Sequence, residues 1–229
     1  LTVEFSGAGV MSLNIEERMT LCNMAIEAGG KNGIIPCDDK TVEYVRERTA
    51  RAGTRREFTP VENDPDAVYF SEKVFKMADL EPMVAKPHSP DNKAFVREVK
   101  GTKLTRAYIG SCTGGKVTDF LKSAAILKGR EVKVPTFIVP STTEVDMALD
   151  GEKVDGQTLR EIFPIAGCTI GPASCAACLG GPADTFGRIN EAGEVCISAT
   201  NRNFPGRMGH KQSEVYLASP MTVAASAIN

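Results

Sequence analysis

Apolar and polar positions in the first part of the chain predict a strand followed by a well-marked helix. Thr2 begins a short apolar strand, and Asn14 with Glu17 three residues later forms the capping-box pattern that starts a helix. Gly29 and Gly30 end this helix. One of its faces is expected to be buried and consists of residues at helical spacing: Ile15, Met19, Cys22 and Ile26.

Further along, the pattern predicts a second helix over 39–52 and strands at 68–75 and 83–84. The segment 86–92 then combines two prolines with turn-forming polar residues. Such a composition interrupts regular structure, so we expect a linker there.

The remaining chain has the pattern of an α/β unit. Its elements are a strand, a loop, a helix and a strand, at 106–109, 110–116, 117–128 and 132–139. This order gives parallel strands and a right-handed crossover. A helix over 156–163, a loop rich in Gly, Pro and Cys, and a strand over 194–199 follow. We therefore expect an α/β fold with two α/β/α lobes and mostly parallel sheets, at 1–90 and 91–229.

Composition and charge exclude several classes of protein. The net charge of −2 in 229 residues argues against nonspecific nucleic-acid binding, which requires many phosphates to be neutralised. No run approaches the ~20 apolar residues of a membrane span, so we expect a soluble protein. Seven cysteines without a regular spacing favour a reducing compartment. Because the chain opens on Leu1 and at once on a strand, we expect it to be part of a longer protein.

The glycine-rich loop Gly110–Lys116 has two interpretations. It fits G-x-x-x-x-G-K, the pattern of a phosphate-binding loop, but Val117 stands where a hydroxyl should meet Mg²⁺. The favoured alternative makes Cys112 a metal ligand at the end of a strand.

Cys175 and Cys178 are the natural partners of Cys112, because two thiols three residues apart in a turn can face one metal site. Zinc, a redox dithiol and an iron–sulfur cluster are all compatible with this pattern. Three thiols without a fourth ligand favour a site that keeps one position open. The other cysteines are expected to be structural: Cys22, Cys37, Cys168 and Cys196.

A polar loop directly after the predicted strand at 194–199 carries Arg202 and Arg207. Two guanidinium groups in one strand-end loop suit bidentate capture of two carboxylates. The alternative is a pair of solvated surface arginines, but the neighbouring Asn201, Asn203 and Gly206 favour a binding loop.

Together these segments resemble the aconitase superfamily, and within it most closely the large subunits of the isopropylmalate dehydratases. The resemblance rests on three long motifs: Tyr-Ile-Gly-Ser-Cys-Thr-Gly-Gly-Lys at 108–116, Ser-Cys-Ala-Ala-Cys-Leu-Gly-Gly-Pro-Ala-Asp at 174–184 and Thr-Asn-Arg-Asn-Phe-Pro-Gly-Arg-Met-Gly-His at 200–210. It implies that the two lobes correspond to the family's second and third domains.

The resemblance also implies roles for individual residues. Cys112, Cys175 and Cys178 match the three ligands of a [4Fe-4S] cluster whose fourth iron stays free for substrate. Arg202 and Arg207 match the arginines that bind the substrate's carboxylates. The neighbours of the cluster are expected to be Asn23, Asn201 and Ser111, and Glu27 is expected to be catalytic.

The activity that the resemblance implies is interconversion of 2-isopropylmalate and 3-isopropylmalate, by dehydration and rehydration, in leucine biosynthesis. The family's N-terminal domain and its small subunit carry further active-site groups, and neither is in this chain. We therefore expect the chain to be inactive alone. Its expected partners are the missing N-terminal domain and the small subunit, and its expected substrate is a small dicarboxylic hydroxy acid. Cytoplasm and plastid stroma are both compatible compartments.

Other functions are kept as alternatives. A homoaconitase or an aconitase-type hydratase would share the cluster and differ in the substrate's side group. A noncatalytic cluster-binding subunit would retain the thiols but does not need Glu27, Arg202 or Arg207. A zinc-binding module would use the same thiols with a fourth ligand such as His210.

Overall fold

The computed structural model describes residues 1–54 and 57–229, which form two compact units, Leu1–Leu80 and Glu81–Asn229. The division lies before the position 90 that the sequence predicts. Residues 86–92 are the turn between β3 (Met83–Ala85) and β4 (Lys93–Phe95), an antiparallel pair in the second unit. The prolines and polar residues that mark a linker also suit a hairpin turn, which is why the two could not be told apart.

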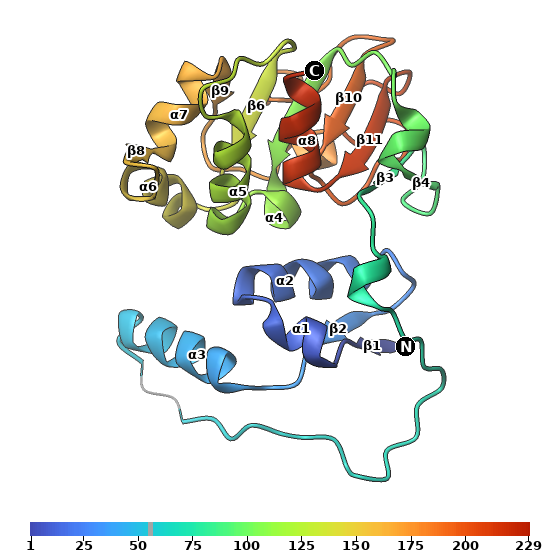
Figure 1. Ribbon diagram of the computed structural model, residues 1–229, viewed down its shortest axis with the longest axis vertical. Helices are drawn as coiled ribbons and strands as arrows, with labels where there is room; N and C mark the ends of the chain where they lie inside the picture. Colours follow the sequence, from blue (N-terminus) through green and yellow to red (C-terminus); the bar gives the residue numbers. More distant parts are fainter. Residues whose placement is uncertain (55–56) are drawn as a thin grey trace. The chain divides into compact units, whose positions relative to one another are not determined.

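The first unit is built on a small parallel sheet of β1 and β2 (Figure 1). Its elements are β1 (Thr2–Glu4), α1 (Ala8–Ser12), α2 (Ile15–Met24), β2 (Asn32–Ile34), α3 (Asp39–Arg51) and the 3-10 turn η1 (Met77–Asp79). The predicted capping box is present, because Asn14 Oδ1 accepts from Glu17 N and Glu17 Oε2 accepts from Asn14 N, both at 2.9 Å.

Two expectations for the first unit are wrong. Helix α2 ends at Met24, and Met19 and Ile26 are 41% and 51% exposed, so the predicted apolar face is not buried as a whole. The residues buried there are Arg18 and Ala25. The predicted strand at 68–75 has no regular structure, and its apolar side chains are exposed. Alternation alone does not make a strand without a neighbouring strand to pair with.

A buried ion pair fixes α2 against the start of α3. Arg18 donates to both carboxylate oxygens of Asp38, at 2.8 and 2.7 Å, and to the carbonyls of Leu13 and Met11. Asp38 also caps α3 by accepting from Thr41 N at 3.1 Å. The hydrogen bond from Arg18 holds the pKa of the Asp38 carboxyl well below its usual range.

The second unit is a mixed sheet with the strand order β4-β3-β11-β10-β5-β6-β9 (Figure 1). Besides β3 and β4, its strands are β5 (Arg106–Gly110), β6 (Thr136–Val139), β9 (Cys168–Ile170), β10 (Val195–Ser198) and β11 (Glu214–Ala218). The five strands β11, β10, β5, β6 and β9 are parallel, and β3 joins β11 in the antiparallel sense. The predicted fold class, α/β with mostly parallel strands, is confirmed.

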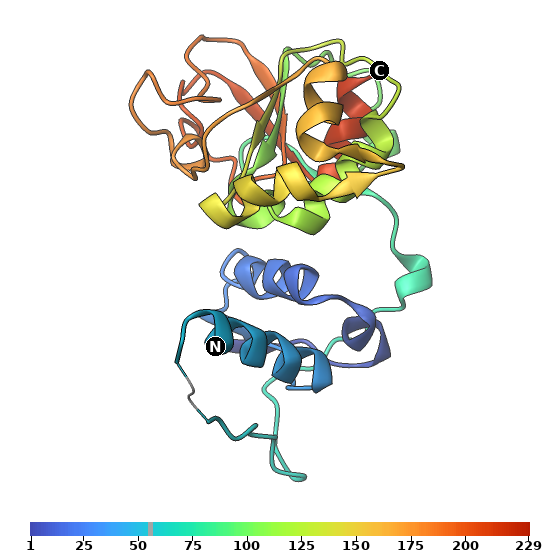
Figure 2. The ribbon, with the colours of Figure 1, turned by 90° about the vertical axis from the view of Figure 1, so that its left-hand side faces the viewer.

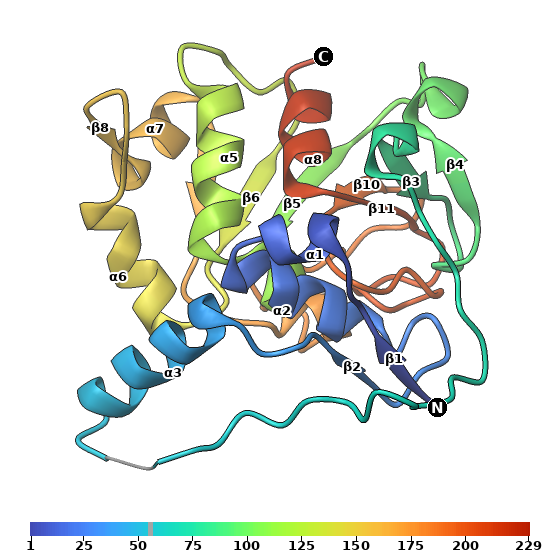
Figure 3. The ribbon, with the colours of Figure 1, turned by 60° about the horizontal axis from the view of Figure 1, so that its bottom comes forward.

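Helices cover one face of this sheet, and long loops cover the other (Figure 2). The helices of this unit are α4 (Ser111–Gly114), α5 (Val117–Leu127), α6 (Thr143–Gly151), α7 (Leu159–Ile165) and α8 (Pro220–Ala227), with 3-10 turns η2 (Val96–Val99) and η3 (Ala177–Leu179) and the small hairpin β7 (Lys153–Val154) and β8 (Gln157–Thr158). Helices α5 and α8 lie side by side across β5 (Figure 3). Period-two alternation along β5 sends Ala107 and Ile109 to this helical face, and Tyr108 to the face covered by loops.

We predict that Arg18→Met loosens the first unit and removes part of its acid sensitivity. The variant leaves the Asp38 carboxylate without its guanidinium partner, although Lys40 still donates to the carbonyls of Met11 and Leu13. The loss should cost about 2 kcal/mol in the free energy of opening of α2 and α3 at pH 7. Because the pKa of Asp38 is lowered in the fold, this stabilisation is present above pH ~4 and is lost as the pH falls. Hydrogen exchange of α2 and α3 between pH 3 and 7 measures both effects. Arg46→Met, on an exposed position of α3, is the control, and an equal loss in both variants would contradict the prediction.

Candidate functional site

The candidate site lies where the order of the strands reverses. From β5 the chain moves through β6 to β9 on one side, then crosses back to β10 and β11 on the other side. The loops after two adjacent parallel strands, β5 and β10, therefore diverge at the carboxyl edge of the sheet. Ligands of open α/β sheets bind at this position.

Cys112 lies in the loop after β5, in the single turn α4, and its side chain is exposed. Ser111 before it has φ 72°, a left-handed conformation that a residue with a side chain adopts at an energetic cost. This backbone turn is what places the cysteine at the edge of the sheet.

The side chain of Lys116, in the same loop, folds back and contacts the loop itself. Its ammonium group donates to the carbonyl of Thr113 and pairs with Asp119 at 2.9 Å, with only 9% of the side chain exposed. A phosphate-binding loop would need this charge for its ligand. The geometry supports the interpretation that Lys116 stabilises the cysteine-bearing loop.

Cys175 and Cys178 lie in the loop after β9, the second of them in η3. The Cys175 thiol is hydrogen-bonded to both Cys112 and Cys178, so the three predicted ligands meet although they come from two different loops. Cys178 is buried, and its thiol donates to Asn201 Oδ1 at 3.5 Å. The loop after β6 supports both segments, since Ser141 N donates to Gly115 O and Ser174 N donates to Pro140 O.

The loop after β10 brings Asn201, Arg202 and Arg207 to the same edge. Asn203 anchors it, because its buried amide donates to Lys86 O at 2.8 Å and Val215 O at 3.0 Å. The guanidinium of Arg207 lies close enough to Cys178 to favour its thiolate.

Backbone contacts hold the three loops together. A Cβ on Gly114 would lie 2.4 Å from Ala199 Cβ, so the loop after β5 packs directly on the end of β10. A Cβ on Gly180 would lie 3.0 Å from Gly206 O and 3.1 Å from Arg207 O. Gly180 also has φ 69°. Glycine is required at both positions because there is no room for a side chain.

The electrostatics set Cys178 apart from the structural cysteines. The hydrogen bond from Cys175 lowers the pKa of Cys178 to about 7 against the effect of burial, with help from Arg207. The pKa of Cys175 lies above its ordinary value, because the bond with Cys178 and burial outweigh the lowering effect of Cys112. Burial raises the pKa of Cys168 and of Cys196 to about 12, which agrees with inert structural thiols.

The three thiols are donors of the type that an iron–sulfur cluster binds. Within the described part of the chain, no group of three or more His, Cys, Asp and Glu side chains is arranged to hold one metal ion. A cluster binds each thiolate on a different iron, so its ligands need only surround it. A buried polar atom of Arg207, Nε, has no hydrogen-bond partner within the described residues, as expected beside an anionic ligand.

His210 does not join the thiols as a fourth ligand. Its Nδ1 accepts from Gln212 N at 3.1 Å, and its backbone N donates to Ile189 O. Asn23 and Glu27 belong to the first unit and are half-buried there. Their part in the site stays a prediction, as do the roles of Ser111, Asn201 and Arg202.

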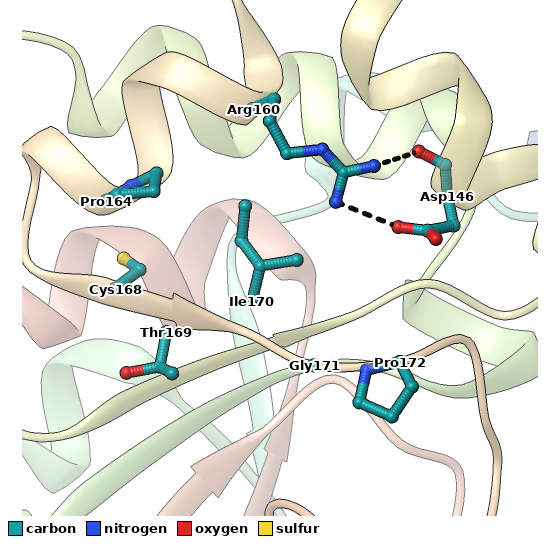
Figure 4. Close-up of a pocket in the computed structure, with 8 residues that line it drawn as sticks. All are labelled: Asp146, Arg160, Pro164, Cys168, Thr169, Ile170, Gly171 and Pro172. Carbon is teal, nitrogen blue, oxygen red and sulfur yellow. Dashed lines mark hydrogen bonds and ion pairs between the residues drawn. The ribbon is translucent and has the colours of Figure 1, made fainter.

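A pocket of the second unit has none of the three thiols in its lining. It is lined by residues of α6, α7 and the end of β9: Asp146, Arg160, Pro164, Cys168, Thr169, Ile170, Gly171 and Pro172 (Figure 4). Arg160 is already paired with Asp146 and Asp150, at 3.0 Å each. This pocket therefore has no uncompensated charge with which to recognise a ligand.

Two positions of the site were not singled out from the sequence: Tyr108 on the loop-covered face and Gly114 at the contact with Ala199. Asn203 was named only as a neighbour of the arginines, and the structure shows that its amide anchors their loop. All three stand inside the motifs of the sequence. Their burial depends on which strand face or turn they occupy, and the motifs alone do not give that.

No helix in 1–54 or 57–229 has both the length and the apolar character needed to cross a bilayer.

The sequence matches the Aconitase family (aconitate hydratase) over residues 1–229. It is 55% identical to the chloroplastic large subunit of 3-isopropylmalate dehydratase from Arabidopsis thaliana, covering 99% of this chain and 45% of that protein. It is 47% identical to a 3-isopropylmalate dehydratase large subunit of Methanopyrus kandleri, covering 100% of this chain and 52% of that protein. It is 43% identical to a probable methanogen homoaconitase large subunit of Methanosarcina mazei, covering 99% of this chain and 54% of that protein. The chain spans about half the length of the curated relatives it matches.

We predict that Gly114→Ala separates the loops of the site. The added methyl group would overlap Ala199, whose backbone cannot move without disturbing β10, so the second unit should lose about 1–3 kcal/mol of stability. Urea unfolding followed by hydrogen exchange in β5 and β10 measures the change. Gly151→Ala is the matched control, because a Cβ there meets nothing within 4 Å. Equal stability of the two variants would refute the close packing of the loops.

Proposed function

Since this chain belongs to the aconitase family, we propose that it forms the cluster-binding part of an iron–sulfur hydro-lyase that interconverts 2-isopropylmalate and 3-isopropylmalate. The observation that carries the proposal is the meeting of three thiols from two loops beside a partly unpaired arginine, at the switch point of a parallel sheet. The relatives named as 3-isopropylmalate dehydratases support the choice of substrate.

Cys112, Cys175 and Cys178 would hold a [4Fe-4S] cluster. When bound, such a cluster with one iron free of protein ligands supplies a Lewis acid for the hydroxyl group of the substrate. Cys178 is prepared for this role, because its neighbours favour the thiolate that binds metal. The exposed Cys112 marks the side of the site that faces solvent.

Arg207 and Arg202 would bind the two carboxylates of the hydroxy acid. The buried, unpaired Nε of Arg207 offers a donor that a carboxylate oxygen can accept from. Asn203 holds the loop in place, so the guanidinium groups keep their positions when the substrate arrives. Fixing both ends of the diacid allows water to leave one carbon and return at its neighbour without loss of orientation.

Glu27 is proposed as an acid–base group and Asn23, Asn201 and Ser111 as neighbours of the cluster. We further propose that the complete enzyme needs a small subunit and the remainder of the large subunit, and that this chain alone does not turn over substrate. A reducing compartment, such as a plastid stroma or a cytoplasm, suits a protein whose seven cysteines all carry free thiols.

A homoaconitase is the second candidate, because the chain is also 43% identical to a probable methanogen homoaconitase large subunit. It would use the same thiols and arginines on a substrate with a different side group. Comparing turnover of 3-isopropylmalate and homoaconitate by the assembled enzyme decides between them.

We predict that the chain purified without oxygen binds about four irons and four sulfides, and that Cys112→Ser and Cys178→Ser abolish this binding. Iron, acid-labile sulfide and visible absorption measure it. Cys37→Ser is the matched control, because Cys37 belongs to the first unit and the three thiols belong to the second. One zinc per chain and no iron after anaerobic reconstitution would overturn the proposal.

We predict that Arg207→Gln in the assembled enzyme lowers kcat/KM by about 100-fold while the iron content is unchanged. The loss reflects one charge-assisted contact to a substrate carboxylate. Arg130→Gln, at an exposed position, should keep full activity. Unchanged substrate binding in Arg207→Gln would favour a noncatalytic cluster-binding subunit instead.

A further inference from the structure

Tyr108 carries a buried hydroxyl group that has no hydrogen-bond partner within the described residues. Its side chain is 0% exposed and is the largest of those that are fully buried. Buried hydroxyl groups normally find a partner, and an unpaired one usually marks a partner that is still to bind.

The ring of Tyr108 is held in one position by backbone on two sides. A Cβ on Gly110 would lie 2.9 Å from Tyr108 Cε1, and a Cβ on Gly187 would lie 2.7 Å from Tyr108 Cε2. Both edges of the ring therefore rest against glycine backbone. The ring cannot move to bring the hydroxyl group to a partner, so the position of the hydroxyl group is fixed before a partner binds.

Tyr108 is buried in the same core cluster as Ala177, which lies between Cys175 and Cys178 in the C-x-x-C turn. Burial first, and then the charges of Cys178, Cys175 and Cys196, raise the pKa of Tyr108, so its oxygen keeps its proton at neutral pH. Cys196 offers no anionic sulfur, because burial raises the pKa of its thiol to about 12. The sulfurs that remain are those of Cys178 and Cys175 at the proposed cluster site.

We propose that the Tyr108 hydroxyl donates a hydrogen bond to anionic sulfur at the Cys178 end of the cluster site and thereby stabilises the reduced cluster. This inference rests on the proposed function, since it needs the cluster to be present. Hydrogen bonds to cluster sulfurs raise the reduction potential, because they stabilise the form with the greater negative charge. The role is distinct from packing, since it belongs to one O–H group and not to the ring.

Tyr108→Phe tests the proposal, because it removes only the oxygen. Tyr216→Phe is the matched control: Tyr216 lies on β11 and packs against the helical core on the opposite face. Without the cluster, the Tyr108→Phe chain should unfold at a urea concentration equal to or above that of the wild type, because the lost hydroxyl has no partner there. A lower midpoint, or a chain that fails to fold, would overturn the proposal by showing that the hydroxyl is already paired.

With the cluster reconstituted anaerobically, Tyr108→Phe should bind as much iron and sulfide as the wild type. Its reduction potential should be lower, and its iron–sulfur stretching frequencies should shift in resonance Raman spectra. Labelling with ³⁴S-sulfide separates shifts of bridging sulfide from shifts of cysteinyl sulfur, and either supports the hydrogen bond. Tyr216→Phe should change neither measurement.

An unchanged potential and spectrum in a fully loaded Tyr108→Phe chain would overturn this inference and leave the proposed function intact. A wild-type chain that takes up no iron would overturn the proposed function, and the inference would fall with it. The two failures are therefore distinguished by the iron content of the wild type.

Discussion

The site depends on one constraint, the backbone contact between the loops that leave β5 and β10. Two adjacent parallel strands end at the same edge, but their crossovers run in opposite directions. Their loops pack together because Gly114 has no side chain. A Cβ at this position would overlap the Cβ and the carbonyl oxygen of Ala199. Gly180 makes the corresponding contact with the arginine loop. The thiols and the guanidinium group are neighbours because these glycines allow it.

The two faces of the large sheet have different roles. Helices cover one face with an apolar core, and that core supplies the stability of the second unit. The opposite face is covered by loops whose backbone carries the cysteines and arginines. Alternation along β5 connects the two faces, because Ile109 packs in the helical core while Tyr108 packs on the loop-covered face beside Ala177 of the C-x-x-C turn.

The sequence predicted the elements whose signals are local. The capping box at Asn14 and the helix from Asp39 are confirmed, since their signals lie within a few residues. The strand at 68–75 was wrong, because a strand depends on pairing with a distant segment. The two units of the structure divide after Leu80, before the expected position 90. The motifs indicated the cysteine ligands and the arginines. They gave no sign that Tyr108 is enclosed, because that depends on the approach of Gly187 from another loop.

The distribution of the three thiols between two crossovers has a consequence for the order of biogenesis. Cys112 follows β5, whereas Cys175 and Cys178 follow β9, and the helices α5, α6 and α7 and the strands β6 and β9 of the sheet lie between them in the chain. An extended chain brings only the pair in the C-x-x-C turn together. In the proposed cluster site all three thiols come together only once the sheet has formed, so the cluster would bind to a folded chain. A scaffold that donates clusters would accordingly meet a folded acceptor, with Cys112 as its accessible entry point.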